Sequence, residues 1–312
     1  MLAKMKSALA SQSKVIEVIN RKTGEKFIEK IYGEDAMRVF YGNKFRANMT
    51  SHLLTNRFVS NVYGAFNDSA ASKYKIEEFI HTMNIDISEC EKDISEYKSF
   101  NDFFARKLRP QVRPIENSPN SIASPGDGRL LVFPKIDATT ISYIKWAPIK
   151  LIDLFHGNNS LEERYKNGSC AVLRLCPVDY HRFHFPVSGK AGVTKSIPGL
   201  LHSVNPYALE QGINVFCLNK RTICELDSND FGKILLMEVG ALFVGSVVQT
   251  YRPGTDITKG EEKGFFKFGG STCIFFFEHD TMEFSPDLIQ NSAAGIESFV
   301  HMGEQIGQLV SF

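Results

Sequence analysis

Short runs of β-branched and aromatic residues, each broken by Gly, Pro, Asn or Asp, fill the chain beyond residue 125. Runs of this length and composition are typical of β-strands joined by tight turns. The predicted strands cover residues 129–133, 171–176, 213–218, 221–226, 233–239 and 242–249. Few helical periods separate them, so the sequence predicts a mostly antiparallel β domain.

The N-terminal part of the chain has a different pattern. The charged turn at residues 21–26 predicts a hairpin or short ribbon before the first helix. Apolar residues then recur at helical spacing in two segments, 54–66 and 76–83, which predicts two amphipathic helices. The apolar positions are Leu54, Phe58, Val62 and Phe66 in the first segment, and Ile76, Phe79, Ile80 and Met83 in the second.

A third helix is expected to begin after Ser99, an N-cap residue, with Asp102 near its positive end. It should carry Phe103, Phe104 and Leu108 and stop before Pro110. Prolines at 110, 114 and 119 then mark a boundary. The expected fold class is α+β: a helical N-terminal region, 1–110, packed as a layer on a mostly antiparallel β-rich region, 111–312.

Composition excludes several classes of protein. With 312 residues, 43% of them apolar, the chain can bury a substantial core, and 36 basic against 35 acidic residues argue against a globally basic nucleic-acid binder. The six cysteines include no C-x-x-C pair and favour buried reduced thiols over a disulfide framework or a zinc site. No run of about 20 apolar residues predicts a membrane span, and the N-terminus lacks the apolar region of a secretory signal.

One basic segment stands apart. Residues 36–66 contain Arg38, Lys44, Arg46 and Arg57 but no Asp or Glu. An amphipathic, aromatic-rich and locally basic segment can lie on an anionic membrane surface. It can equally form a helical layer packed on the rest of the protein, and the pattern alone leaves both open.

Three polar clusters in the β-rich region could carry chemistry. In 124–129, Asp127 lies between two glycines, where it can form an ordinary tight turn or orient an imidazole. In 179–186, strand alternation sends His181 and His184 to opposite faces, so a shared metal site is disfavoured and no metal is expected. In 268–272, two glycines precede Ser271. This stretch can form a hairpin turn, or Ser271 can act as a nucleophile. Asp127, His184 and Ser271 together supply carboxylate, base and nucleophile.

These residues resemble the phosphatidylserine decarboxylases, pyruvoyl-dependent enzymes that mature by cutting themselves. Four motifs carry the resemblance in the family's order: Ser-Pro-x-Asp-Gly-Arg at 124–129, Asp-Tyr-His-Arg-x-His-x-Pro at 179–186, Ser-Val-Asn-Pro at 203–206 and Gly-Ser-Thr at 270–272. The family usually has Leu-Gly-Ser-Thr at the cleavage point, and this chain is similar to the branch with Gly-Gly-Ser-Thr. The resemblance covers nearly the whole chain.

The resemblance implies a two-stage mechanism. Asp127 orients His184, which deprotonates Ser271 as its oxygen attacks the carbonyl of Gly270, and the chain is cut between 270 and 271. Ser271 becomes a pyruvoyl group, the covalent cofactor, which forms a Schiff base with phosphatidylserine and accepts electrons as CO2 leaves to give phosphatidylethanolamine. His184 then delivers a proton, and His181 helps to position the substrate.

A lipid substrate changes the interpretation of the basic segment 36–66, which now favours docking on an anionic membrane surface. The expected location is peripheral to a membrane that the sequence does not identify, with fragments 1–270 and 271–312 remaining associated. Oligomeric state, a homodimer included, and acyl-chain preference stay open. Two other functions also stay open: a hydrolase that retains Ser271, and a β-rich binding or scaffold protein without catalysis.

Overall fold

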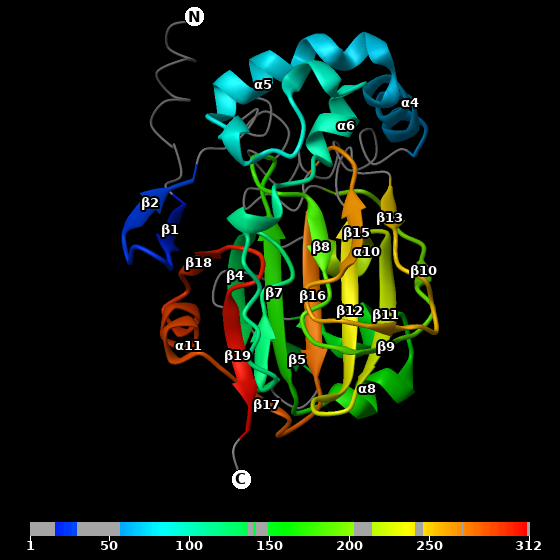
Figure 1. Cartoon of the computed structure of the whole chain (residues 1–312). Helices are drawn as coiled ribbons and strands as arrows, with labels where there is room; N and C mark the ends of the chain where they lie inside the picture. Colours follow the sequence, from blue (N-terminus) through cyan, green and yellow to red (C-terminus); the bar gives the residue numbers. More distant parts are fainter. Residues whose placement is uncertain are drawn as a thin grey trace, which may run out of the picture.

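The computed structural model describes residues 16–29, 57–136, 140–141, 149–202, 214–240, 246–269 and 271–310. Within these ranges an extended antiparallel sheet is capped at one end by helices, which confirms the predicted α+β class (Figure 1). The basic segment 36–66 falls outside the described residues as far as residue 56, as do Gly270 and the motif at 203–206.

The main sheet has eleven described strands, and its order gathers segments from the whole chain. From one edge to the other it runs β14 (Asp256–Ile257), β9 (Gly189–Ala191), β11 (Arg221–Ser228), β12 (Gly232–Gly240), β16 (Ser271–Phe277), β7 (Ser169–Leu175), β4 (Gly128–Phe133), β18 (Glu297–Val300), β1 (Glu17–Asn20) and β2 (Lys26–Ile28), and β10 (Lys195–Ile197) pairs with β11. Every described pairing in it is antiparallel except that of β1 with β18. The β1–β2 hairpin confirms the predicted ribbon.

Three smaller sheets accompany it. One contains β13 (Val247–Gln249), β15 (Glu262–Phe266) and β8 (Arg182–His184); a second contains β17 (Met282–Phe284), β19 (Gln305–Leu309) and β3 (Ser121–Ala123); the third pairs β5 (Thr140–Ile141) with β6 (Ile149–Lys150). The helices beyond residue 110 are η4 (Pro110–Val112), α7 (Leu151–Leu154), α8 (Asn159–Tyr165), α10 (Val215–Leu218) and α11 (Pro286–Ala293).

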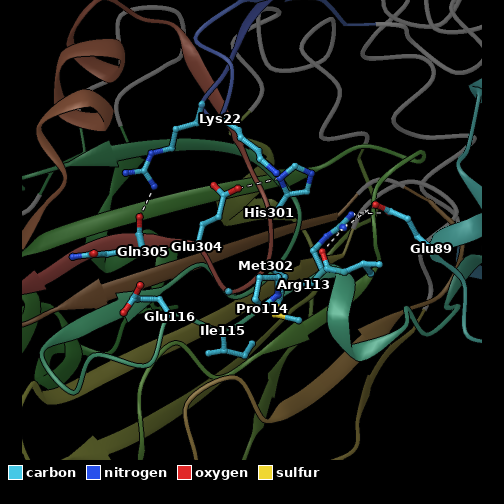
Figure 2. Close-up of a pocket in the computed structure, with 13 residues that line it drawn as sticks. Lys22, Glu89, Arg113, Pro114, Ile115, Glu116, His301, Met302, Glu304 and Gln305 are labelled. Atoms are coloured by element: carbon cyan, nitrogen blue, oxygen red, sulfur yellow. Dashed lines mark hydrogen bonds and ion pairs between the residues drawn. The ribbon is translucent and has the colours of Figure 1, made fainter.

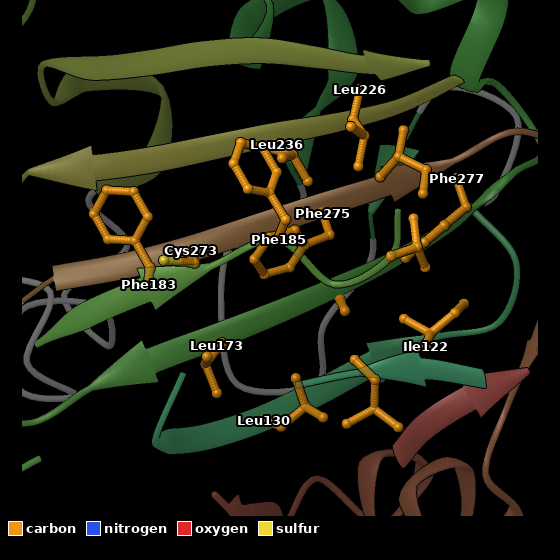
Figure 3. Close-up of a cluster of buried hydrophobic side chains, with 14 of the residues drawn as sticks. Ile122, Leu130, Leu173, Phe183, Phe185, Leu226, Leu236, Cys273, Phe275 and Phe277 are labelled. Carbon is orange, nitrogen blue, oxygen red and sulfur yellow. The ribbon is translucent and has the colours of Figure 1, made fainter. Parts of the chain in front are cut away.

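Strand β16 lies at the centre of the core. Its alternate residues Cys273 and Phe275 join one buried cluster, and Ile274 and Phe276 join another on the opposite face of the sheet. A strand buried on both faces reads as a continuous apolar run, which explains the sequence after Ser271. Figure 3 shows the first cluster, in which Phe185 lies beside Phe275 and Phe183 lies beside Cys273.

Residues 57–104 form a separate helical layer over one end of the long strands (Figure 1). It contains α4 (Arg57–Asp68), η1 (Ala70–Tyr74), α5 (Lys75–Met83), η2 (Ile87–Glu89), η3 (Ile94–Glu96) and α6 (Phe100–Phe104). The two amphipathic helices are therefore confirmed, and the Ser99 hydroxyl accepts the Asp102 N–H as an N-cap should. Among the described helices, each falls short of the length and apolar character that crossing a membrane requires.

Two predicted elements were wrong. The third helix ends at Phe104 rather than continuing past Leu108, because Leu108 pairs with Cys90 in an isolated β-bridge. The predicted strand at 213–218 is the helical turn α10 over its described part. Its adjacent residues Val215 and Phe216 enter the same buried cluster, which the alternation of a strand does not allow.

Candidate active site

Ser271 begins β16 where the strand emerges beneath the helical layer. Backbone pairing holds it between Leu175 of β7 and Gly240 of β12, and its side chain is fully buried. Its hydroxyl oxygen lies 3.3 Å from Nδ1 of His181. The nearest imidazole in the hydrogen-bond network is thus His181, while His184 makes its hydrogen bonds elsewhere.

The hydrogen bonds of His181 define its tautomer. Nε2 lies 2.9 Å from the carbonyl oxygen of Cys176, which can only accept, so Nε2 carries the proton. Nδ1 of a neutral ring is then an acceptor, and the Ser271 hydroxyl donates to it. The ring also stacks on Phe104 of α6 with centroids 3.9 Å apart, which fixes its plane.

The surroundings keep His181 neutral. Burial, and after it the positive charge of Arg106, lower the pKa of His181 from 6.5 to about 3. Arg106 is itself buried and donates to the carbonyl oxygens of Val178 and Asp179. At neutral pH the imidazole therefore has a free lone pair directed at the serine hydroxyl.

This pKa predicts a stability that depends on pH. Between pH 6.5 and 5 the unfolded chain binds a proton at residue 181 that the folded chain does not bind. The free energy of unfolding should therefore fall as the pH falls, by an amount that approaches about 1.4 kcal/mol per pH unit from this residue near pH 5. Urea titrations of the Ser271→Ala chain, with and without His181→Gln, measure this contribution. An identical pH slope for both chains would contradict the depressed pKa.

His184 is the last residue of β8 and belongs to a different hydrogen-bond network. Its Nδ1 donates to the carbonyl oxygen of Gly260 at 2.9 Å, and its Nε2 is 3.2 Å from the Tyr180 hydroxyl, which therefore donates to it. Burial lowers the pKa of His184 as well. His184 is thus a neutral imidazole whose acceptor nitrogen faces a phenol.

Asp127 is held by an arginine. Its carboxylate accepts from Nε and Nη2 of Arg113, at 3.0 and 2.7 Å, and from the Met302 N–H at 2.8 Å. Arg113 also binds Glu89, so one guanidinium joins the layer to the Asp127 turn. No hydrogen bond joins Asp127 to either imidazole among the described residues; its charge nevertheless acts on His184, whose pKa it raises slightly against the effect of burial.

A cavity of about 630 Å³ lies next to the residues that hold Asp127. Arg113 and Met302, which both hydrogen-bond to Asp127, line this cavity (Figure 2). His301 pairs with Glu304 in its wall, and Arg21 reaches it from the β1–β2 hairpin. Its lining includes neither Ser271 nor the two motif histidines.

The structure therefore brings Ser271 and His181 together and places His184 and Asp127 nearby in separate networks. Sequence patterns identified both histidines but missed the residues that hold them: Tyr180, inside the same motif, and Phe104, on the capping helix. Arg113 also escaped notice, because its partners are distant in the chain. No group of three His, Cys, Asp or Glu side chains suited to a metal occurs in the ranges that the structure describes.

Comparisons with known proteins agree over most of the chain. Residues 100–308 match the family model for phosphatidylserine decarboxylase. The phosphatidylserine decarboxylase proenzyme of Clostridium perfringens (strain ATCC 13124) is 45% identical over 293 residues, which cover 94% of this chain and 99% of the relative. The proenzymes of Clostridium tetani (strain Massachusetts / E88) and Clostridium botulinum (strain Kyoto) are 45% and 43% identical, each over 94% of this chain and 98% and 99% of their own. These relatives are named as enzyme precursors.

Proposed function

The chain belongs to the phosphatidylserine decarboxylase family, and from that premise we propose that it decarboxylates phosphatidylserine to phosphatidylethanolamine after cutting itself between Gly270 and Ser271. The observation that carries the proposal is the buried Ser271 hydroxyl donating to a neutral imidazole. A hydroxyl so placed can be deprotonated as it attacks a carbonyl. The site therefore supports the first stage of the family's chemistry.

The 3.3 Å contact supports His181, rather than His184, as the base of that stage. Ser271 Oγ attacks the carbonyl carbon of Gly270 and transfers its proton to Nδ1 of His181, and the proton passes to the departing amide nitrogen, so the peptide becomes an ester. Loss of the Ser271 α-proton then expels the Gly270 carboxylate and leaves dehydroalanine. Hydrolysis of dehydroalanine consumes one water, releases ammonia and leaves a pyruvoyl group at position 271.

The residues around position 271 fit such a group, because the group derives from Ser271 itself and its position is buried beside the neutral imidazole of His181. A pyruvoyl group supplies an electron sink for decarboxylation. His184 retains its predicted role of delivering a proton to the product; its unprotonated Nε2 must first take up a proton, and the Tyr180 hydroxyl, which donates to that nitrogen, can supply it. His181, once cleavage is complete, remains beside position 271 to orient the substrate.

Asp127 acts in this proposal through charge and turn geometry. Its carboxylate is buried, and Arg113 and the Met302 N–H fix its orientation. From there its negative charge favours protonated His184. The resemblance implies that Asp127 orients the histidine that acts as the cleavage base. To bind an imidazole, Asp127 would first have to release Arg113 or the Met302 N–H.

Cleavage should leave one folded unit made of two chains. The fragment 271–312 contains β16, which pairs along its whole length with β7 and from Ser271 to Phe276 with β12 of the fragment 1–270. Its residues Phe275 and Phe276 also fill the core on both faces of the sheet. Separating the fragments would expose this apolar surface, which supports their lasting association.

A lipid substrate requires contact with a membrane. The part of the basic segment that the structure describes lies in α4, where Val62 and Phe66 are 55% and 38% exposed, and Tyr74 of η1 is 69% exposed. These apolar side chains on the helical layer support peripheral docking on an anionic membrane surface. The helical region, 1–110, would then carry the docking face and the region 111–312 the catalytic residues.

Intact-mass analysis of the purified protein tests the proposal. It should resolve two chains, one ending at Gly270 and one beginning with a blocked pyruvoyl group at position 271, and the protein should release CO2 from phosphatidylserine vesicles. An uncut chain that hydrolyses esters would favour the hydrolase. An uncut and inactive chain would favour the binding or scaffold protein.

A further inference from the structure

Phe268, just before the two glycines of the cleavage point, is bound by the helical layer, while the backbone N–H of Lys267 still donates to Ser246 beside β13. Phe268 is buried in a cluster with Ile76, Phe79, Met83, Tyr97, Phe100, Phe103 and Phe104. Among the buried members that the structure describes, Phe268 alone comes from outside residues 76–104. Its ring centroid lies 4.9 Å from that of Phe100 and 5.0 Å from that of Phe104.

A side-chain amide holds the backbone at the same place. The Phe268 N–H donates to Oδ1 of Asn101 at 2.9 Å, and Nδ2 of Asn101 donates to Oδ1 of Asp68 at 2.9 Å. Asp68 therefore fixes which way the amide points, and it also binds Lys267 at 2.7 Å. The Asn101 side chain is only 5% exposed. A substitution that removes its amide therefore leaves the Phe268 N–H buried without this acceptor.

The other side of the cleavage point is held by the sheet. Ser271 is paired with both neighbouring strands, and only Gly269 and Gly270 link it to Phe268. Gly269 has φ 143°, a backbone conformation that favours glycine, and this conformation redirects the chain from the layer. Thus the bond to be cut belongs to a two-glycine link between two fixed anchors.

The same aromatic cluster also positions the base. Phe104 contacts the Phe268 ring on one side and stacks on His181 on the other, with centroids 3.9 Å apart. An intramolecular attack is fast when the reacting groups are held in position. A displacement of one reacting group by about 1 Å can lower the rate about 100-fold.

We propose that the helical layer is a clamp for self-cleavage, in which Asn101 and Phe268 are positioning residues that fix the peptide on the N-terminal side of Ser271. The inference rests on the proposed function. The contact of Asn101 with Phe268 acts only on cleavage, since decarboxylation follows after the bond between 270 and 271 is gone, and the stacking of Phe104 on His181 does not depend on this contact. Loosening it should slow maturation while leaving the matured enzyme's turnover unchanged.

The test measures two rates in each variant: appearance of fragment 271–312 after synthesis in a cell-free system, and CO2 released per molecule of that fragment. Asn101→Ala should slow cleavage about 10- to 100-fold, with CO2 release per fragment unchanged. The exchanged pair Asn101→Asp with Asp68→Asn restores an acceptor for Phe268 and a donor to support it. It should cut within roughly threefold of the unaltered chain, because the two contacting changes compensate.

Phe103→Leu is the matched control. Phe103 lies in the same helix and cluster and packs against Phe79 and Tyr97, so the change weakens the layer without removing the amide contact. It should cut faster than Asn101→Ala at equal loss of thermal stability. The clamp is refuted if Asn101→Ala cuts at the normal rate, or if both variants slow equally and the exchanged pair fails to recover. An unaltered chain that never cuts would instead refute the proposed function.

Discussion

Ser271→Ala should yield a single uncut chain that releases no CO2 from phosphatidylserine. Alanine lacks the oxygen that attacks Gly270 and cannot be converted to a pyruvoyl group, so both stages are lost together. The fold should persist, because among the described residues the serine hydroxyl bonds to His181 alone, and the backbone pairing of β16 is independent of the side chain. Denaturing electrophoresis with intact mass, and CO2 capture, measure the two losses.

A second buried serine provides the control. Ser298 lies in β18 of the same sheet, is fully buried and accepts a hydrogen bond from Asn291. Ser298→Ala removes a comparable hydroxyl away from the imidazoles and should cut and decarboxylate normally. Substantial CO2 release by Ser271→Ala would refute a cofactor made from this serine.

Replacing each histidine by glutamine should separate the two stages. Glutamine keeps hydrogen-bonding capacity but cannot act as a base, so His181→Gln should slow cleavage about 100- to 10,000-fold, the usual contribution of a general base. His184→Gln should cut at close to the normal rate, since its ring bonds to Gly260 and Tyr180 rather than to Ser271. Its CO2 release per cut molecule should fall by a similar factor. Time courses of cleavage, followed by CO2 assays on the cut fraction, measure both.

The opposite result would restore the order of roles that the resemblance implies. If His184→Gln fails to cut while His181→Gln cuts normally, His184 is the cleavage base and the contact between Ser271 and His181 is incidental. Tyr180→Phe gives an independent check on the second stage. It removes the phenol hydroxyl bonded to His184 and should lower CO2 release without slowing cleavage.

Local pattern predicted the elements whose conformation depends on their own residues. The amphipathic spacing in 76–83 depends on apolar side chains along one helix face, and the N-cap at Ser99 on a backbone N–H within the first turn. Both were confirmed. The prediction failed at 213–218, where a β-branched run forms a helical turn because two adjacent side chains enter one core cluster. Burial by distant strands outweighed local propensity there.

By itself the sequence determined the α+β class and the family, and it predicted Ser271 as the reacting serine, because these depend on periodicity and on motifs read along the chain. Only the tertiary structure decided which imidazole meets Ser271. Residues 181 and 271 are distant in the chain, and whether their side chains touch depends on the pairing of β16 and on the packing of Phe104 against the ring. The anchoring of Phe268 by Asn101 is likewise a contact between distant segments. Neither the helix around Asn101 nor the residues before β16 contain a sequence pattern that indicates the other partner.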